Sequence, residues 1–366
     1  MNRLLITGGA GFIGANFCHY WSAAHPADRL VVLDALTYAG NLASIEPLIA
    51  KKRLRFVHGD IGDQGRVAAL LTEEGIDSIV NFAAESHVDR CIEDSQSFLR
   101  TNVMGTHSLL EAARRVWTHA AEGGYRFHHV STDEVYGSLG PNDPRFSETT
   151  PYAPNSPYSA SKAAADHIVR AYAHTYGIPC TISNCSNNYG PYQFPEKLLP
   201  LCIVNILEGR ALPIYGDGLQ VRDWLHVSDH CRAIDLILQS SPAGETWNVG
   251  AGSTEPNLHV VETICDLVDL EFGHNKELAA RYPHSPPAQG RPSRSLMEFV
   301  RDRPGHDRRY AVDSRKIAGL GFTAQTPLSA GLVATVRWYL NNENWWKSIV
   351  SGKYRTWYAN QYAAPG

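Results

Sequence analysis

Short apolar runs alternate with longer helical stretches along the first half of the chain. Six of these runs have the length of a β-strand and are bounded by turn residues: 4–7, 30–33, 54–58, 78–83, 127–131 and 181–184. Strands that alternate with helices pair in parallel, because each helical crossover returns the chain to the same end of the sheet. The pattern therefore predicts an α/β fold built on a doubly wound parallel sheet.

The alternation weakens after residue 190, where prolines begin to punctuate the loops. We expect a first domain at 1–190, joined by part of 225–255, and a second, smaller domain at 191–366. Residues 282–295 hold four prolines and are predicted to form an irregular surface loop.

A glycine-rich segment directly follows the first predicted strand. Residues 8–14 read GGAGFIG and lead into a helical stretch, so Gly8, Gly11 and Gly14 allow the backbone to approach a pyrophosphate at a helix N-terminus. Asp34 follows about 20 residues later, at the end of the second run, where a carboxylate binds an adenine ribose diol and repels a 2′-phosphate. These features predict a Rossmann-type site for NAD rather than NADP.

Two later segments carry acid–base groups. Residues 131–137 read STDEVYG and residues 158–162 read YSASK. Tyr158 and Lys162 share one face of a helix, so we expect the ammonium group to lower the pKa of the phenol from about 10 and make it a general base. The adjacent carboxylates of Asp133 and Glu134 can reach different atoms of one substrate, and their surroundings can set their pKa values apart. A simple alcohol dehydrogenase needs no such pair.

Composition and charge argue against several other functions. The formal net charge is -4 and the basic residues form no cluster, so no nucleic-acid partner is expected. No apolar run is long enough to span a membrane, and the chain enters its first strand without a signal peptide, so we expect a cytoplasmic protein. The seven cysteines are scattered without metal-ligand spacing, which favours free buried thiols and no metal site.

Two sets of aromatic residues are expected to be structural. His128 and His129 fall in a predicted strand and are expected to pack in the core. The second set consists of the C-terminal tryptophans, which are expected to pack helices rather than stack on a base: Trp338, Trp345, Trp346 and Trp357.

Several segments, distributed along nearly the whole chain, carry a family resemblance. They are GGAGFIG (8–14), LTYAGN (36–41), AAESHVDR (83–90), STDEVYG (131–137), YSASK (158–162), NCSNNYGP (184–191), FPEKL (194–198) and DRPGHDRRY (302–310). Together they resemble the extended short-chain dehydrogenase/reductase family, and most closely its dTDP-glucose 4,6-dehydratases. Nucleotide-sugar epimerases share the glycines, the tyrosine and the lysine, but are less similar at Asp133-Glu134 and at 302–310.

This resemblance implies an activity, the NAD-dependent dehydration of dTDP-glucose to dTDP-4-keto-6-deoxyglucose. Tyr158 would take the proton of the 4-hydroxyl while hydride leaves C4 for NAD, Thr132 would bond the same oxygen, and Lys162 would hold the cofactor ribose. Glu134 would then remove the C5 proton while Asp133 protonates the departing 6-hydroxyl, and hydride would return to C6. The choice of acid and base rests on the resemblance, because spacing does not decide it.

The resemblance also implies a set of binding residues, and for residues 60–61 and 82–84 their positions at strand ends support it. The expected cofactor-binding residues are Gly8, Gly11, Phe12, Ile13, Gly14, Asp34, Leu36, Thr37, Asp60, Ile61, Phe82, Ala83, Ala84, Ser86, Thr101, Tyr158, Lys162 and Asn188. The expected substrate-binding residues are Ser86, Thr132, Asn187, Lys197, Leu198, Pro213, Tyr215, Arg222, Asn257, Asp302, Arg303 and His306.

Other readings stay open at this point. Within the same chemistry, the chain would be another nucleotide-sugar 4,6-dehydratase or a 4-epimerase. A catalytically silent NAD-binding regulator would share the fold, but the intact acid–base set argues against it. A structural role is compatible with catalysis, since the helical stretches at 95–117 and 158–176 would pair in a four-helix bundle of a homodimer, as the resemblance implies.

Overall fold

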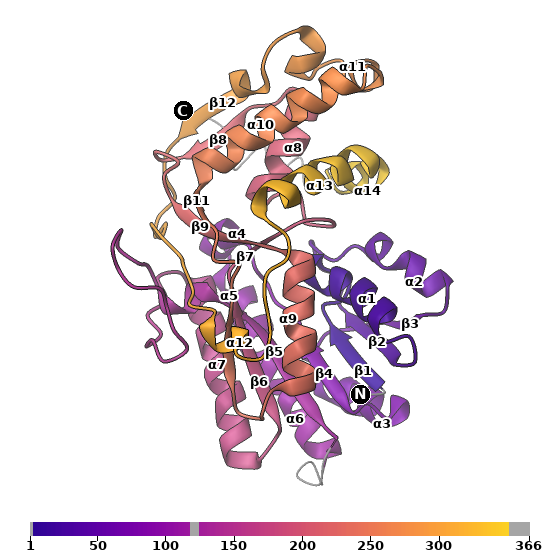
Figure 1. The fold of residues 1–366 in the computed structure, drawn as a ribbon. Coiled ribbons are helices and arrows are strands. Elements are labelled where there is room, and N and C mark those ends of the chain that lie inside the picture. The colour runs from indigo at the N-terminus through magenta and orange to yellow at the C-terminus, as the bar shows by residue number, and fades with distance from the viewer. Residues whose placement is uncertain (1–2, 118–123, 351–366) are drawn as a thin grey trace.

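Seven parallel strands form the central sheet of the computed structural model, which describes residues 3–117 and 124–350 (Figure 1). The spatial order is β10-β6-β5-β4-β1-β2-β3. The strands in that order are β10 (Thr246–Val249), β6 (Cys180–Cys185), β5 (Arg126–Thr132), β4 (Ser78–Asn81), β1 (Arg3–Thr7), β2 (Arg29–Asp34) and β3 (Leu54–His58). The predicted doubly wound parallel sheet is confirmed.

The six predicted strands are confirmed, with ends that differ by at most two residues. The largest difference is at 78–83, because β4 ends at Asn81 and leaves Phe82 and Ala83 in a loop. The chain turns there to pass over Gly8, where a β-carbon would come within 2.7 Å of the Ala83 nitrogen. This loop contributes to the site described below.

Helices cover both faces of the sheet (Figure 1). On one face lie α3 (Gln64–Glu74), α6 (Thr106–Val116) and α7 (Pro157–Tyr176). The other face carries α1 (Phe12–Ala24), α2 (Glu46–Ala50) and α9 (Val227–Ser240). Each layer has its own apolar core, with Leu109 and Val169 in the first and Phe17 and Ile234 in the second. The sheet is buried on both sides, as a parallel sheet requires.

The predicted helix at 95–117 is a composite. It consists of α5 (Ser95–Phe98), the π-helical segment η2 (Leu99–Gly105) and α6. The wider turn directs Asn102 inward, where its amide accepts a hydrogen bond from the Glu85 backbone (2.9 Å) and donates one to Ser161 (2.8 Å). The helix thereby fixes the loop after β4 and the first turns of α7.

The remaining strands form two small sheets in the upper part of Figure 1. The first holds β11 (Thr254–Pro256), β9 (Val221–His226) and β7 (Asn187–Tyr189), and the second holds β12 (Met297–Val300) and β8 (Leu212–Tyr215). Three longer helices share a third core there: α8 (Leu198–Glu208), α10 (Asn257–His274) and α13 (Leu328–Asn341). The short elements are α4 (Val88–Glu93), α11 (Glu277–Arg281), α12 (Arg315–Ala318), α14 (Glu343–Ile349), η1 (Leu42–Ser44), η4 (Asp133–Tyr136), η5 (Pro286–Gln289) and η6 (Ser293–Leu296).

The proline-rich segment 282–295 is more ordered than an irregular loop. It contains the 3-10 turns η5 and η6, and the hydroxyl of Ser293 donates to Asp269 of α10 at 2.5 Å. The carboxylate anchors the loop onto the third core, a contact that proline content does not reveal.

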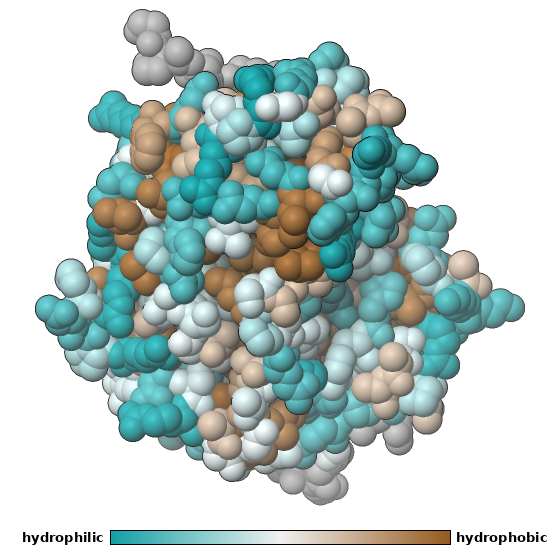
Figure 2. Space-filling model, turned by 45° about the horizontal axis from the view of Figure 1, so that its top comes forward, coloured by the Kyte–Doolittle hydropathy of each residue, from teal (hydrophilic) through white to brown (hydrophobic). Residues whose placement is uncertain are grey.

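The expected structural aromatics do pack in the described part of the chain. The Trp338 and Trp345 rings lie 5.2 Å apart, and Trp346 is fully buried, whereas Trp357 lies outside the described residues. His128 and His129 are fully buried in β5. Figure 2 shows polar residues over most of one face, with apolar ones gathered near its middle. Among the described helices, none combines the length and hydropathy that a membrane crossing needs.

Candidate active site

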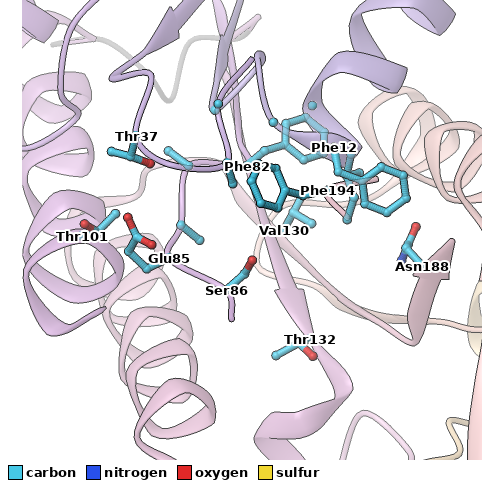
Figure 3. Close-up of a pocket in the computed structure, with 18 of the residues that line it drawn as sticks. Phe12, Thr37, Phe82, Glu85, Ser86, Thr101, Val130, Thr132, Asn188 and Phe194 are labelled. Carbon is cyan, nitrogen blue, oxygen red and sulfur yellow. The ribbon is translucent and has the colours of Figure 1, made fainter. Parts of the chain in front are cut away.

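A cavity opens at the carboxyl ends of the central strands, where the winding of the sheet reverses between β1 and β4. Such a reversal leaves a crevice, because the two adjacent connections leave in opposite directions. Figure 3 shows Phe12, Phe82 and Phe194 grouped near its centre, with Thr101 and Asn188 on opposite sides. The cavity therefore joins segments from both halves of the chain.

Most of the sequence-predicted site residues line this cavity. They are Gly8, Gly11, Phe12, Ile13, Gly14, Asp34, Thr37, Asp60, Ile61, Phe82, Ala83, Ala84, Ser86, Thr101, Thr132, Glu134, Tyr158, Lys162, Asn187, Asn188 and Lys197. The predicted residues that lie outside its lining are Leu36, Asp133, Leu198, Pro213, Tyr215, Arg222, Asn257, Asp302, Arg303 and His306.

The glycine loop packs closely at the start of α1. Gly8 has a φ of +68°, a conformation that favours glycine, and a β-carbon on Gly14 would lie 2.2 Å from the Gly8 carbonyl oxygen. Gly11 is the N-cap of α1 and offers no side chain to cap the helix. The first backbone N–H groups of α1 are thus available to an anion.

Asp34 fixes two loops at the end of β2. Its carboxylate accepts hydrogen bonds from the backbone N–H groups of Ala10 and Leu36, both at 2.8 Å. Burial raises the pKa of Asp34, and these two hydrogen bonds oppose the rise. Leu36 has a φ of +49° and serves the site through its backbone, which explains why its side chain does not line the cavity.

The acid–base residues are placed by the end of β5 and the start of α7. Thr132 ends β5, and its hydroxyl accepts from the Glu134 backbone (3.3 Å) to start the turn η4. Ser156 begins α7 with a capping box shared with Ser159. This cap orients the first turns of α7, which carry Tyr158 into the cavity beside Thr132.

The expectation that Lys162 lowers the pKa of Tyr158 is wrong for this structure. Burial raises the pKa of the phenol well above its usual value, and the charge of Glu134 raises it further, while a hydrogen bond with Thr132 lowers it. The ammonium group of Lys162 instead donates to the Val130 carbonyl at 2.8 Å. Helical spacing puts the two residues on one face, but the hydrogen bond to strand β5 fixes the position of the ammonium group.

The two adjacent carboxylates lie in different surroundings. Asp133 is only 1% exposed and is not among the residues that line the cavity, and burial and then the charge of Glu134 raise its pKa well above the usual range. Burial also raises the pKa of Glu134, but three cations oppose that rise: Arg303, Arg222 and Lys197. The environment therefore favours a protonated Asp133 beside a more acidic Glu134.

A second group of polar residues surrounds Asp89 on α4. The Tyr215 hydroxyl donates to its carboxylate at 3.2 Å, and Arg303 lies 3.7 Å from the other oxygen. Nearby, His306 contacts Asp302 at 2.6 Å, and the His306 ring meets the edge of Tyr215. The structure thus brings together four of the predicted substrate residues outside the cavity lining.

The other predicted site residues are held by side-chain hydrogen bonds or stand within helices and strands of the upper part of the chain. Arg222 is 4% exposed and donates to the Asp307 carbonyl at 2.9 Å. Pro213 lies in β8, Leu198 begins α8 and Asn257 begins α10. Lys197 donates to the Ser86 carbonyl at 2.8 Å, and Asn188 holds His230 through its side-chain oxygen at 2.9 Å.

Several buried polar atoms in this region accept or donate no hydrogen bond within the described part of the protein. They are Oδ1 of Asn187 and Asn257, Oδ2 of Asp133 and Nε of Arg303. A buried polar atom without a partner is costly, so such a group commonly awaits a ligand or water.

Sequence reasoning missed two acidic residues of the lining, Glu85 and Glu196. Both stand in the quoted segments AAESHVDR and FPEKL. Glu196 is 5% exposed and accepts from Arg90 at 2.9 Å, and the Arg90 guanidinium stacks over Tyr38 at 4.0 Å. The signal available in the sequence was the adjacency of Glu196 to Lys197.

The fold and the cavity define a class of protein, the dinucleotide-dependent enzymes of the short-chain dehydrogenase/reductase type. A glycine loop at a strand–helix turn, an acidic residue after β2, and a tyrosine and lysine four apart on one helix occur together in this class.

Comparisons with known proteins give the family. The family model described as GDP-mannose 4,6 dehydratase matches residues 5–335. The dTDP-glucose 4,6-dehydratase of Xanthomonas campestris pv. campestris is 52% identical over 97% of this chain and 98% of its own. The dTDP-glucose 4,6-dehydratase of Streptomyces venezuelae, solved with NAD and TYD bound, is 46% identical with a TM-score of 0.84 over 95% of this chain and 99% of that chain.

A more distant structure represents the alternative chemistry. The UDP-glucose 4-epimerase of Thermus thermophilus, in complex with NAD, is 26% identical with a TM-score of 0.78 over 93% of this chain and 99% of that chain. The dehydratases are thus nearer in sequence. The chain belongs to the dTDP-glucose 4,6-dehydratase family.

Proposed function

We propose that this chain is an NAD-dependent lyase that dehydrates dTDP-glucose to dTDP-4-keto-6-deoxyglucose. The observation that carries the proposal is that the glycine loop and four acid–base residues, Thr132, Glu134, Tyr158 and Lys162, line one cavity. The relatives at 46% and 52% identity that carry this activity in their names support it.

The residues of the cavity fit NAD. The tight turn at Gly8 and Gly14 leaves the N-terminus of α1 open to a pyrophosphate, and the Asp34 carboxylate suits a ribose diol while repelling a 2′-phosphate. When bound, NAD supplies an acceptor for hydride from C4 and a donor to C6, and its oxidised ring adds a positive charge. The other predicted cofactor-binding residues that line the cavity are likewise assigned to NAD.

For the first step, Tyr158 is the proposed base that takes the proton of the 4-hydroxyl, and Thr132 hydrogen-bonds the same oxygen. Lys162 is assigned to the cofactor ribose. Because burial and Glu134 hold the pKa of the phenol high in the free protein, positive charge in the occupied site is needed to make it a base near neutral pH.

For the elimination, Asp133 is the proposed acid and Glu134 the proposed base. The raised pKa of Asp133 keeps a proton available for the departing 6-hydroxyl, whereas the cations around Glu134 favour the carboxylate that removes the C5 proton. The two surroundings support the assignment that sequence spacing leaves undecided.

The nucleotide end is assigned to the predicted substrate residues around Arg222 and Arg303. Arg303 has a buried nitrogen without a partner, and Asn187 and Asn257 have unpaired oxygens, which together suit a ligand with both acceptor and donor groups. We assign Ser86, Lys197, Leu198, Pro213, Tyr215, Asp302 and His306 to the same ligand.

The proposed division of labour follows from these assignments. Residues 1–190 with part of 225–255 form the NAD-binding part, and 191–366 form most of the nucleotide-sugar part. The pairing of β10 with β6, which brings 246–249 into the main sheet, supports this division.

We propose that the protein works as a homodimer in the cytoplasm. Exposed apolar side chains lie on the expected pairing helices, with Leu99 51%, Met104 58% and Tyr176 51% exposed, and a second copy of the chain would cover them. All seven cysteines are free and buried, which suits a reducing compartment.

An isotope experiment tests the proposed reaction. Deuterium placed at C4 of dTDP-glucose should reappear at C6 of the same sugar, while the hydrogen at C5 should come from solvent, because the C5 proton removed by the Glu134 carboxylate exchanges with water and the hydride does not. Mass spectrometry and NMR of the product measure both. Return of the label to C4 with inverted configuration would favour a 4-epimerase, and loss of the label to water would reject both reactions.

The nucleotide is tested by competition among the thymidine, uridine, cytidine and guanosine diphosphoglucoses. The proposal expects the thymidine compound to bind most tightly and turn over fastest. Preference for another base would instead identify another nucleotide-sugar 4,6-dehydratase.

A further inference from the structure

A polar stripe runs along α7 from the cavity toward the surface. Tyr158, Lys162, Asp166 and Arg170 follow one another at intervals of four residues, so they share one helix face. Tyr158 is 8% exposed, Lys162 3% and Asp166 0%. The stripe faces β5 and β6, against which α7 packs (Figure 1).

Lys162 is an ammonium group in a dry site. It donates to the Val130 carbonyl at 2.8 Å and lies 3.3 Å from Nε2 of His129. Burial lowers its pKa, and the charge of Asp166 is the main opposing influence, ahead of Cys185 on β6. Burial holds the pKa of the Cys185 thiol near 12, so that thiol stays neutral. A buried charge needs a partner, and the carboxylate that serves here is Asp166.

Asp166 is held as a buried carboxylate by donors on both neighbouring elements. Its Oδ2 accepts from the hydroxyls of Ser131 and Tyr152, each at 2.9 Å. Its Oδ1 faces Nε2 of His129 at 3.5 Å. Burial raises its pKa, and Lys162 is the strongest influence that lowers it, followed by Ser131, Tyr152 and the charge of Arg170. The charge of Lys162 and the hydrogen bonds thus support the same charged state.

His129 lies between the two charges and is itself neutral. It is fully buried, and burial together with the charge of Lys162 holds its pKa well below the usual value. The Asn81 amide on β4 contacts Nδ1 at 3.1 Å, and Asn81 in turn accepts from Thr7 at 2.6 Å. The ring is therefore fixed from the side away from α7, and its Nε2 faces both the ammonium and the carboxylate.

We propose that Asp166 is a positioning residue for the oxidation step: as the buried counter-ion of Lys162, with His129 between them, it keeps Lys162 charged and directed at the cofactor side of the cavity. This inference rests on the proposed roles of Lys162 and Tyr158. It assigns to Asp166 a part in the reaction, although Asp166 touches neither substrate nor cofactor.

The first test is the pH dependence of kcat/KM and of NAD binding in Asp166→Asn. Loss of the negative charge lowers the pKa of Lys162, so the high-pH limb of kcat/KM should move to lower pH by about 1 to 3 units. NAD affinity, measured by fluorescence titration at each pH, should fall over the same lowered pH range as kcat/KM. An Asp166→Glu variant restores the charge and should return the limb most of the way to its original pH.

Tyr152→Phe is the matched control. It removes a hydrogen bond from the same oxygen of Asp166 but leaves the charge, so it should lower the unfolding midpoint without moving the limb. If Asp166→Asn and Tyr152→Phe both lower stability while the pH profiles superimpose on that of the unmodified protein, Asp166 is only structural and the proposal fails.

A second test measures only the stability of the folded protein. Lys162→Met, Asp166→Asn and the double variant form a cycle of denaturant midpoints. If the two residues form a buried ion pair, Asp166→Asn alone leaves an unpaired ammonium, and the double variant should unfold at a higher denaturant concentration than Asp166→Asn. Additive effects would overturn the proposal. Should Asp166→Asn fail to fold, a folded double variant supports the pair, and an unfolded one overturns it.

This cycle is independent of the proposed reaction. If the chain does not dehydrate dTDP-glucose, the isotope experiment gives a negative result. The denaturant cycle would still measure the coupling between Lys162 and Asp166. The two failures are therefore distinguishable.

Discussion

Asp133 and Glu134 are neighbours in the chain, yet their side chains lie in different surroundings. Asp133 is buried near the carboxylate of Asp223, whereas Glu134 lines the cavity close to three cationic side chains. Desolvation and local charge, rather than residue type, therefore separate their pKa values. The same effects act on Tyr158, whose phenol is less acidic in the free protein than its spacing from Lys162 suggests.

Tyr158→Phe should remove most of the activity and leave NAD bound. The phenol supplies the proposed general base, which typically contributes a factor of about 10² to 10⁴, whereas the glycine loop and Asp34 hold the cofactor. Single-turnover kinetics and NAD titration measure the two separately. Near-normal turnover would contradict the assignment of Tyr158 as base.

Replacing both carboxylates tests whether they serve elimination alone. With Asp133→Asn and Glu134→Gln, C4 oxidation should continue in part while water loss stops, so reduced cofactor should accumulate in the absorbance spectrum. A double variant that dehydrates normally would refute the proposed acid and base, and one that fails even to oxidise would assign the pair to the first step instead.

Asp223 gives the protein a stability that depends on pH. Burial raises its pKa from 3.8 to about 6, so the folded state binds this proton more tightly than the unfolded state. The stabilisation from protonated Asp223 is fully present below about pH 4 and is lost as the pH rises through about 6. The free energy of unfolding therefore falls by about 3 kcal/mol over this range. Denaturant unfolding at several pH values should show this fall for the unmodified protein and a smaller one for Asp223→Asn. If the free energies of unfolding of the two proteins change in parallel with pH, Asp223 does not cause the fall.

At the scale of elements, the site depends on how chain segments turn at the ends of strands. The glycine loop joins β1 to α1, the turn η4 follows β5, and the π segment η2 lets Asn102 tie the loop after β4 to α7. Each junction is fixed by close backbone packing or by a buried hydrogen bond. The positions of the site residues therefore tolerate little change in these turns.

Gly14→Ala tests the first of these junctions. The new β-carbon would lie 2.2 Å from the Gly8 oxygen, so α1 must shift, which should lower NAD affinity at least tenfold and the free energy of unfolding by about 1 to 3 kcal/mol. Gly273→Ala in α10 is the control, because nothing lies within 4 Å of its β-carbon and alanine is the better helix former. Fluorescence titration and thermal unfolding measure both effects, and equal behaviour of the two variants would refute the packing argument.

At the scale of the whole molecule, the cavity is lined both by residues of the main-sheet part and by residues of the smaller upper part of the chain. Residues of β2, β5 and α7 and of the loops that follow β1 and β4 line one side, and Asn187, Asn188 and Lys197 line the other. Activity therefore requires the two parts to keep their relative placement.

Met104→Glu should dissociate the proposed dimer. Met104 is 58% exposed on η2, and burying an unpaired carboxylate in an interface should raise the dissociation constant roughly a hundredfold. Leu270→Glu on α10 is the matched control, since Leu270 is 51% exposed but lies away from the expected pairing helices. Sedimentation velocity should find a dimer for the unmodified chain and for Leu270→Glu; a Met104→Glu dimer of unchanged affinity would place the interface elsewhere.

The sequence alone determined the sheet, the glycine loop and the acid–base residues, because these depend on local patterns of hydrophobicity and on short motifs. It also indicated which residues reach the cavity after β1, at the end of β2 and on α7, since strand ends and helix faces follow from periodicity. It did not reveal the π segment or Glu85 and Glu196, whose roles depend on contacts between distant segments.

Only the tertiary structure decided the charge states. Lys162 contacts Val130 and His129 rather than lowering the pKa of Tyr158. Asp133 is buried, whereas Glu134 faces cations. Both results arise because packing against β5 and the C-terminal part sets the solvation and the charges around each group. Motif spacing fixes which groups are near one another along the chain. Desolvation and long-range charge, which decide what those groups can do, arise only when the chain has folded.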